Sequence, residues 1–361
     1  MKKKKFNIYL SISLFSIIFL TLLVSFILKN NKVMSTKINK DYTYGALYTS
    51  IDKSKSTIKK YNSEGVYIND KKIEIGGLTL ASFLKFGIAN TDNIYFPAPI
   101  LGNKPQNFIL EVNKKKLEYK KIEDKNIKTP TFFSIDDNFA YLSVSSLEST
   151  ILSKTDLKTN TTILSKELKG QGLFSTEKEN NLYLASIIHN EKDTPFARIY
   201  IIDKSNFNIL NTIDIDDVLF LTDLIIHDNF LYIAINRDGS DNLSNKIIKL
   251  DLSTNQLSNF IIPFTNINKL YIANDNLLII QYNYNGGKTD NKIAKINLVT
   301  NNIETFSAEN EHISTYILDD SFYSSDGKFI YSYDLNSFKL KNKFKLEEPE
   351  DQVFVSFFIN S

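Results

Sequence analysis

Three polar stretches concentrate the side chains that could bind a ligand: HNEKDTPFAR at 189–198, NRDGSDNLSNK at 236–246 and YNYNGGKTDNK at 282–292. The two arginines of the chain fall in the first two, and a guanidinium makes planar, bidentate contacts to carboxylate or phosphate that an ammonium cannot make. Tyr rings can stack on a sugar or a peptide. We therefore expect a binding site without catalytic residues, made of Asp193, Arg198, Arg237, Asp238, Asp241, Tyr282, Tyr284 and Lys288. The competing interpretation is that these stretches are surface loops that tolerate drift.

Acidic residues gather in IDIDD at 213–217, AENEH at 308–312 and EEPED at 347–351. Converging carboxylates suit a hard cation such as Ca²⁺, which takes six to eight oxygen ligands. The alternative function is thus a metal-assisted, lactonase-like hydrolase that uses Asp217, Asp223, Glu311 and Asp351. The sequence lacks a D-x-D-x-D-G loop, so solvated acids are the competing interpretation. The three histidines, His189, His227 and His312, are far apart, and we expect them at strand ends on the surface.

The composition excludes several kinds of chemistry. The chain has no Cys and no Trp. It therefore has no disulfide, thiol nucleophile, iron–sulfur cluster or cysteine zinc site, and no Trp to stack on a quinone cofactor. G-x-S-x-G, H-E-x-x-H, P-loop and G-x-G-x-x-G motifs are also missing from the sequence. We expect a binding or scaffold protein rather than an enzyme, with no cofactor other than a possible Ca²⁺.

The elements that must position these residues are strands in a repeated unit. An apolar strand, an Asp or Asn, a few polar residues and a second alternating strand recur along the chain, for example in LEVNKKKLEY at 110–119 and IIKLDLSTNQL at 247–257. A period of about 40–50 residues with four short strands is typical of a β-propeller blade. The residues expected at the turns are Asn62, Asn113, Asp156, Asp203, Asp251, Asn297 and Asp334.

The two chain ends are expected to share one blade. Residues 43–50 resemble a second strand without an inner strand before it, and residues 352–360 form a last strand with nothing after it. Pairing them would remove an exposed sheet edge. The sequence thus predicts an all-β fold with seven blades, closed by the C-terminal strand, with six or eight blades as alternatives.

The chain resembles the superfamily of seven-bladed propellers with YVTN-like or quinoprotein-dehydrogenase-like repeats. The resemblance covers about residues 42–361 and depends on DN-x-LY hairpins and on SSDGKFIYSYD at 324–334. It implies a fold, and it implies that ligands gather on one face, where the connections between blades and between second and third strands lie. It identifies no particular protein.

The N-terminal segment predicts membrane anchoring. Four lysines precede an uncharged run at 6–28, which as a helix is long enough to cross a bilayer core of roughly 30 Å. The basic tail at 1–5 favours a cytoplasmic N-terminus. We expect an uncleaved transmembrane signal anchor rather than a cleaved signal, a linker at 29–41 and an extracytoplasmic propeller at 42–361.

Charge and composition complete the prediction. Residues 1–40 hold eight Lys and no acid, whereas the rest of the chain carries 35 basic and 41 acidic residues. The basic balance therefore belongs to the N-terminus, and no nucleic-acid footprint is expected. The expected partners are the membrane and a protein or cell-envelope ligand, and the Lys, Asn and Ile bias suggests a low-GC bacterium.

Overall fold

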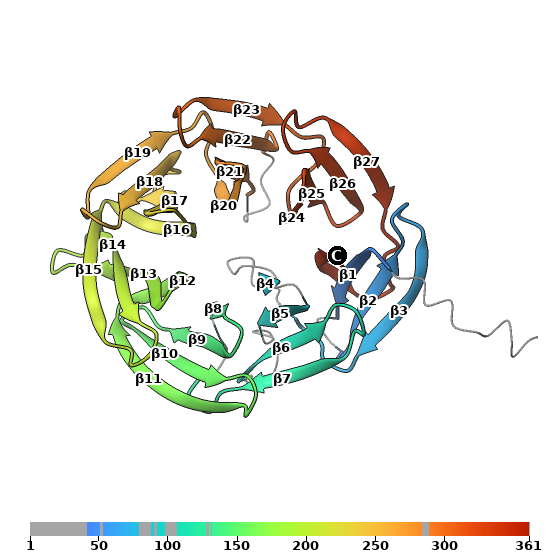
Figure 1. The fold of residues 1–361 in the computed structure, drawn as a ribbon, viewed down its shortest axis with the longest axis horizontal. Helices are drawn as coiled ribbons and strands as arrows, with labels where there is room; N and C mark the ends of the chain where they lie inside the picture. The colour runs from blue at the N-terminus through green and yellow to red at the C-terminus, as the bar shows by residue number, and fades with distance from the viewer. Residues whose placement is uncertain are drawn as a thin grey trace, which may run out of the picture. The chain divides into compact units, whose positions relative to one another are not determined.

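The computed structural model describes residues 42–50, 53–78, 88–89, 92–97, 107–127, 130, 132–283 and 289–360. Within them, 28 strands form seven four-stranded antiparallel sheets around a central axis (Figure 1). The chain is therefore a seven-bladed β-propeller. The predicted anchor at 6–28 lies outside the described residues, among which no helix is long and apolar enough to cross a membrane.

Each blade has the same strand order from the axis outward. Blade 1 contains β28 (Val353–Ile359), β1 (Tyr44–Thr49), β2 (Ser56–Tyr61) and β3 (Tyr67–Ile73). Blade 2 contains β4 (Ile88–Ala89), β5 (Asn93–Pro97), β6 (Phe108–Asn113) and β7 (Tyr119–Glu123). Blade 3 contains β8 (Phe132–Ile135), β9 (Phe139–Ser145), β10 (Ser149–Asp156) and β11 (Thr161–Lys169). Blade 4 contains β12 (Gln171–Lys178), β13 (Asn181–His189), β14 (Pro195–Asp203) and β15 (Ile209–Asp216).

Blade 5 contains β16 (Val218–His227), β17 (Phe230–Asp238), β18 (Lys246–Asp251) and β19 (Leu257–Ile261). Blade 6 contains β20 (Ile267–Ala273), β21 (Asn276–Gln281), β22 (Lys292–Asn297) and β23 (Ile303–Ser307). Blade 7 contains β24 (Ser314–Leu318), β25 (Ser321–Ser325), β26 (Phe329–Asp334) and β27 (Leu340–Lys345). Because neighbouring strands are antiparallel, the turns after the first and third strands lie on one face, here called the turn face. The connections between second and third strands lie on the opposite face, here called the loop face.

Both chain ends contribute to blade 1. Strand β28 pairs with β1, with Tyr44 opposite Ile359 and Thr49 opposite Val353. The inner strand of blade 1 therefore comes from the end of the sequence. The expectation was that residues 352–360 lie beside residues 43–50. Phe358 is fully buried, and a Cβ on Gly45 would overlap its ring, so only glycine fits opposite it.

The predicted Asp and Asn turn residues organise the turn between the third and fourth strands. In blade 5, the Asp251 Oδ1 accepts hydrogen bonds from the Ser253 and Thr254 amides at 2.8 and 3.2 Å. The amide of the residue four positions on, Asn255, donates to the Asp251 carbonyl at 2.8 Å. That residue has a positive φ of 59°, a conformation that Asn tolerates. The side chain of the turn residue thus accepts hydrogen bonds from backbone amides that have no partner in the neighbouring strand.

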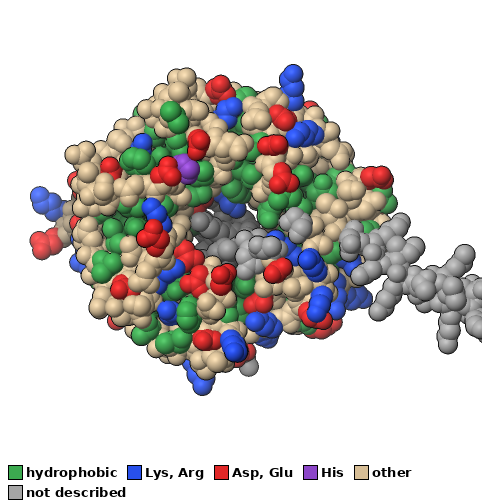
Figure 2. All heavy atoms as spheres, in the orientation of Figure 1, with side chains coloured by type: hydrophobic (Ala, Val, Ile, Leu, Met, Phe, Trp, Pro, Cys, Tyr) green, Lys and Arg blue, Asp and Glu red, His purple; other side chains and the backbone are tan. Residues whose placement is uncertain are grey.

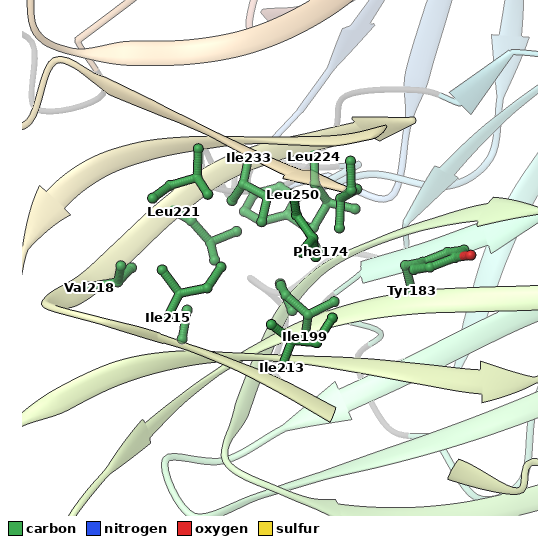
Figure 3. Packing of buried hydrophobic residues seen from close by; sticks show 14 of the residues in the cluster. Phe174, Tyr183, Ile199, Ile213, Ile215, Val218, Leu221, Leu224, Ile233 and Leu250 are labelled. Carbon is green, nitrogen blue, oxygen red and sulfur yellow. The ribbon is translucent and has the colours of Figure 1, made fainter. Parts of the chain in front are cut away.

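Neighbouring blades pack face to face, and their apolar side chains form the core. The largest cluster joins blades 4 and 5, where Ile199, Ile213 and Ile215 lie close to Leu221, Leu224 and Ile233 (Figure 3). A buried polar link crosses the interface of blades 2 and 3, where Asp124 accepts hydrogen bonds from the Ser153 Oγ and the Thr155 Oγ1. The blades therefore form a continuous wall that fixes the connections on both faces.

Lysine side chains also cross between blades. Each ends on a main-chain carbonyl of a turn in the next blade: Lys120 on Leu157 at 3.4 Å, Lys154 on Lys204 at 2.9 Å, Lys166 on Phe207 at 2.7 Å, Lys178 on Asp228 at 2.5 Å and Lys295 on Asn336 at 3.1 Å. Around the face shown in Figure 2, basic and acidic side chains are interspersed. Part of the lysine abundance therefore serves contacts between blades.

Candidate binding surfaces

Two matched hairpin loops stand on the loop face of blades 4 and 5. In blade 4 the Asn190 Oδ1 accepts hydrogen bonds from the Lys192 and Thr194 amides at 2.9 and 3.0 Å. In blade 5 the Asp238 side chain makes the same pair of bonds, at 3.0 and 2.9 Å, to residues two and four positions on. The last residue of each loop, Asp193 or Asp241, has a positive φ of 59° or 65°. This geometry is that of a three-residue hairpin loop with a bulge.

In each of these loops, a basic side chain pairs with the aspartate that has the positive φ. The His189 Nδ1 lies 2.9 Å from the Asp193 Oδ1, and the Arg237 Nη1 lies 2.8 Å from the Asp241 Oδ1. The aspartate side chains remain 92% and 65% exposed. Exposed pairs of this kind contribute at most about 1 kcal/mol each, so their main effect is to fix where the carboxylates point.

A third carboxylate supports the blade 5 loop. Asp217, in the connection between blades 4 and 5, accepts a hydrogen bond from the Gly239 amide at 3.0 Å, and a Cβ on Gly239 would contact the same carboxylate. Leu243, next to this loop, is 43% exposed. We call residues 189–198, 214–217 and 237–243 the loop surface. Its exposed acids outnumber its basic groups, and Leu243 adds an apolar contact point.

The arginines do not lie where the sequence was expected to place them. Arg198 and Arg237 are in strands rather than in loops, because β14 already begins at Pro195 and β17 continues to Asp238. The Arg198 Nε and Nη2 donate to the two carboxylate oxygens of Asp214 at 2.6 and 2.7 Å, across the strand pair, which raises the pKa of Arg198 further. The Arg198 guanidinium, which was expected to recognise a ligand, therefore binds a carboxylate within blade 4. The prediction that both arginines lie in loops was wrong.

The blade 6 part of the predicted site is only partly described. Tyr284 and Lys288 lie outside the described residues. The Tyr282 amide donates to the Asn266 carbonyl at 2.9 Å, and burial, followed by the charge of Glu311, raises the pKa of Tyr282. Tyr282 is thus a half-buried residue of blade 6, whereas Asp193, Asp238 and Asp241 belong to the loop surface.

The four acids considered for Ca²⁺ take part in separate contacts. Asp223 is buried and accepts hydrogen bonds from the Leu224 and Leu270 amides at 2.9 and 3.0 Å, which joins blades 5 and 6. Asp351 pairs with the Lys53 Nζ at 2.8 Å, and this pairing lowers the pKa of Asp351. Glu311 accepts a hydrogen bond from Asn310 through its main-chain carbonyl. Over the described ranges, no group of three or more His, Asp or Glu side chains could hold a metal ion, and the calcium site stays a prediction.

One histidine differs from the expectation of a surface position. His312 is buried, 1% exposed, in the connection between blades 6 and 7, and its Nδ1 lies 2.7 Å from the Ser324 Oγ. Burial lowers its pKa to about 4. Asn310 joins the same network, since it donates to the Ser324 Oγ at 3.0 Å and accepts from the Tyr333 hydroxyl at 2.8 Å. Ser324 is fully buried, so this Ser–His pair serves the packing of blade 7.

A second surface, which sequence reasoning missed, is a groove on the turn face between blades 2 and 3. It encloses about 570 Å³. Its wall includes Asp92, Tyr95, Glu111, Lys120, Asp137 and Phe139. The one sequence signal is the position two residues before the turn residue. It is Glu in blade 2, whereas it is Lys in four blades (Lys60, Lys154, Lys249 and Lys295), Ile201 in blade 4 and Ser332 in blade 7. The wall comes from two blades, so only the packed ring brings it together.

Comparisons with known proteins show the fold and no more. No protein-family model matches the chain, and no curated protein matches its sequence. A functionally unknown protein from Desulfotomaculum acetoxidans is similar with a TM-score of 0.58 and 8% identity, over 88% of this chain and 98% of that one. AztD from Citrobacter koseri gives 0.52 and 10%, over 89% and 99%. The computationally designed Ika8 protein gives 0.55 and 11%, over 88% and 90%. Identity at this level transfers no function.

Proposed function

We propose that this chain is a membrane-anchored β-propeller, displayed outside the cell membrane, that binds a protein or cell-envelope ligand through the loop surface. The matched loops of blades 4 and 5 carry this proposal. Side-chain hydrogen bonds to the loop backbone and side-chain ion pairs fix their conformation, so little conformational freedom is lost when a partner binds. The exposed carboxylates of Asp193 and Asp241 favour a partner with a basic surface, because complementary charge speeds encounter and selects the partner.

The anchor completes the proposal. The uncharged run at 6–28 with its preceding lysines supports a single crossing with a cytoplasmic N-terminus. The described part of the chain begins with Tyr42, whose hydroxyl donates to the Lys114 carbonyl in a turn of blade 2. The chain thus enters the ring on the turn face, and the loop surface lies on the opposite face of the ring.

Affinity capture with the full-length chain tests the binding function. A tagged wild-type chain and a variant with Asp193→Lys and Asp241→Lys are extracted in detergent, mixed with envelope extract, and their retained proteins are compared. We expect a defined partner on the wild-type chain and at least tenfold less of it on the variant. Asp70→Lys, on the exposed outer strand β3 of blade 1, is the matched control and should retain the partner. Equal retention by the loop variant would contradict the role of the loop surface.

A further inference from the structure

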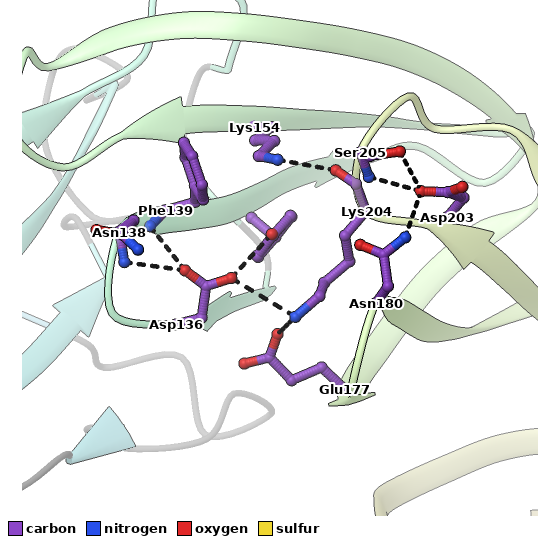
Figure 4. Close-up of polar contacts among 10 residues, drawn as sticks. Asp136, Asn138, Phe139, Lys154, Glu177, Asn180, Asp203, Lys204 and Ser205 are labelled. Carbon is purple, nitrogen blue, oxygen red and sulfur yellow. Dashed lines mark hydrogen bonds and ion pairs between the residues drawn. The ribbon is translucent and has the colours of Figure 1, made fainter.

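The lysine side chains of the ring fall into two groups, according to whether the fold itself uses their charge. Between blades 3 and 4, the Lys204 Nζ is enclosed and lies 2.8 Å from the Glu177 Oε2 (Figure 4). Lys71 and Lys72 in β3 and Lys345 in β27 are exposed instead, and they form no ion pair with the residues that the structure describes. The charges of this second group are therefore available to a partner.

Exposed lysines gather on one side of the outer wall of the ring. The outer strands of blades 7, 1 and 2 (β27, β3 and β7), here called the basic wall, contain seven lysines and two acidic residues, all exposed. The outer strands of blades 4, 5 and 6 (β15, β19 and β23) contain no lysine and three acidic residues. Lys120 and Lys341 pair with a carboxylate of their own blade, which leaves five lysines of the wall without such a partner in the described part of the chain.

The chain enters the ring beside the basic wall. The Tyr42 hydroxyl donates to the Lys114 carbonyl, in the turn that leads into β7. The Lys60 Nζ, from the strand next to β3, is 5.7 Å from the centre of the Tyr42 ring. Burial, followed by the positive charge of Lys71, lowers the pKa of Lys60. Positive charges therefore repel one another close to the point where the chain joins the ring, and an anionic partner would relieve that repulsion.

We propose that the basic wall rests on the anionic phospholipid surface of the bilayer in which the chain is anchored, an inference that rests on the anchor of the proposed function. The predicted linker at 29–41 spans at most about 45 Å when fully extended, so it keeps blade 1 near the bilayer. Lysines close to an anionic lipid surface are attracted to it. Blades 4 and 5 lie across the axis from blade 1 (Figure 1), so this contact leaves the loop surface free for its partner.

The turn face also adjoins the entry of the chain, but its charge does not suit an anionic surface. Its turns between first and second strands in blades 3 to 7 contain no lysine and carry exposed acids, which are Asp137, Glu179, Asp228, Asp275 and Asp319. Like charges would repel this face from anionic lipid. The ring therefore meets the bilayer with its edge, and both of its faces stay open.

Site-specific labelling tests the contact, because the chain has no cysteine of its own. Asn69→Cys and Asn259→Cys place a fluorophore at the exposed third residue of β3 and of β19. The full-length variants are reconstituted in phosphatidylcholine vesicles, with or without anionic phosphatidylglycerol, that contain a lipid with a nitroxide quencher on its headgroup. In about 20 mM salt, where screening is weak, we expect about twofold more quenching of the Asn69→Cys label in the anionic vesicles. The Asn259→Cys label should be quenched equally in both.

Charge variants show whether the lysines of the wall cause the contact. Lys71→Glu together with Lys345→Glu should reduce the quenching of the Asn69→Cys label to its level in neutral vesicles, whereas Lys71→Arg together with Lys345→Arg should retain it. Lys192→Glu together with Lys246→Glu makes the same change of charge in blades 4 and 5, and should leave the quenching as it is. High salt should abolish the difference between the two kinds of vesicle.

Equal quenching of the Asn69→Cys label in neutral and anionic vesicles would overturn the proposal, as would equal effects of the wall variant and its control. Tight binding of soluble polyphosphate without headgroup quenching would assign the wall to a polymeric anion and overturn it as well. Retention of the chain in neutral vesicles after a high-salt wash tests the anchor, and partner capture tests the loop surface. A chain that stays anchored but shows no quenching specific to anionic lipid therefore contradicts this inference alone.

Discussion

The residue four positions after each turn aspartate or asparagine has a restricted backbone conformation. In blades 2 to 7 it has a positive φ, and it is Leu117, Asn160, Phe207, Asn255, Asn301 or Phe338. Asn suits this conformation, whereas other side chains are strained in it by roughly 1–2 kcal/mol. Phe207 and Phe338 accept that strain because their rings pack on the preceding blade, with Phe338 centred 4.6 Å from Phe306. Burial outweighs strain at these positions.

Substitutions at Phe207 should separate the two effects. The side chain is 2% exposed and packs against Tyr141 of blade 3. We expect Phe207→Ala to lower the free energy of unfolding by about 3–5 kcal/mol. Phe207→Asn should cost about 1 kcal/mol less than Phe207→Ala, since Asn relieves the backbone strain. Urea unfolding measures both, and Asn255→Ala, which loses no buried ring, should cost only about 1 kcal/mol. Equal losses for the Ala and Asn variants of Phe207 would contradict the strain argument.

Buried His312 predicts a pH dependence of stability. Its pKa is about 4 in the folded chain, against an ordinary value of 6.5. Between these values the unfolded chain binds more protons, so stability falls as the pH drops from about 6.5 to 4, by about 3 kcal/mol in all. Unfolding by urea at several pH values should show this slope. His312→Gln should flatten it, whereas His189→Gln should keep it because His312 is intact; an unchanged slope in His312→Gln contradicts the assignment.

At the scale of elements, blade 1 has the most distant strands of the ring to bring together, because its inner strand is separated from its other strands by almost the whole chain. Closing such a long loop costs more conformational entropy than forming a hairpin. The strand is held by side chains that enter the core of blades 1 and 2: Phe358 is fully buried beside Leu47 and Phe96. Packing of these few side chains therefore decides whether the ring stays closed.

Truncation of Phe358 should open the ring. We expect Phe358→Ala to lower the free energy of unfolding by about 3–5 kcal/mol, because the cavity removes contacts from two blades. Val353→Ala, in the same strand but 39% exposed, should cost less than about 1 kcal/mol. Urea unfolding compares them, and limited proteolysis should release the C-terminal strand first in Phe358→Ala. Similar losses in the two variants would show that β28 is not held by its buried ring.

The elements also explain which features could be predicted from the sequence. The turn residues, such as Asp251, act locally through their own backbone, so their positions were confirmed. Arg198 was misplaced because the apolar run that predicted this strand starts at Ile199, whereas β14 already begins at Pro195. His312 is buried by contacts between blades 6 and 7, which no local pattern encodes. The groove has the same origin, since Glu111 and Leu157 belong to different blades and meet only in the closed ring.

On the scale of the whole molecule, the two faces differ in how the chain uses them. Tyr42 and the groove lie on the turn face, where the Tyr42 carbonyl accepts a hydrogen bond from the Asn360 Nδ2 at 3.1 Å. The loop surface lies on the opposite face, with Asp193 and Asp241 at its tips. Under the proposed function, the anchor would join the ring at the turn face, and the charged loops on the opposite face would be left for a partner.

The lack of cysteine in the chain allows a direct test of this arrangement. Ser240→Cys, at the exposed tip of the blade 5 loop, should react in intact cells with a membrane-impermeant maleimide, because an anchor with four cytoplasmic lysines leaves the propeller outside. Lys3→Cys should react only after the cells are permeabilised. Ser186→Cys, fully buried in β13, is the control for specific labelling and should react only after denaturation. Labelling of Lys3→Cys but not of Ser240→Cys in intact cells would reverse the proposed orientation, and release of Ser240→Cys from the membrane fraction as a shorter chain would show a cleaved signal instead of an anchor.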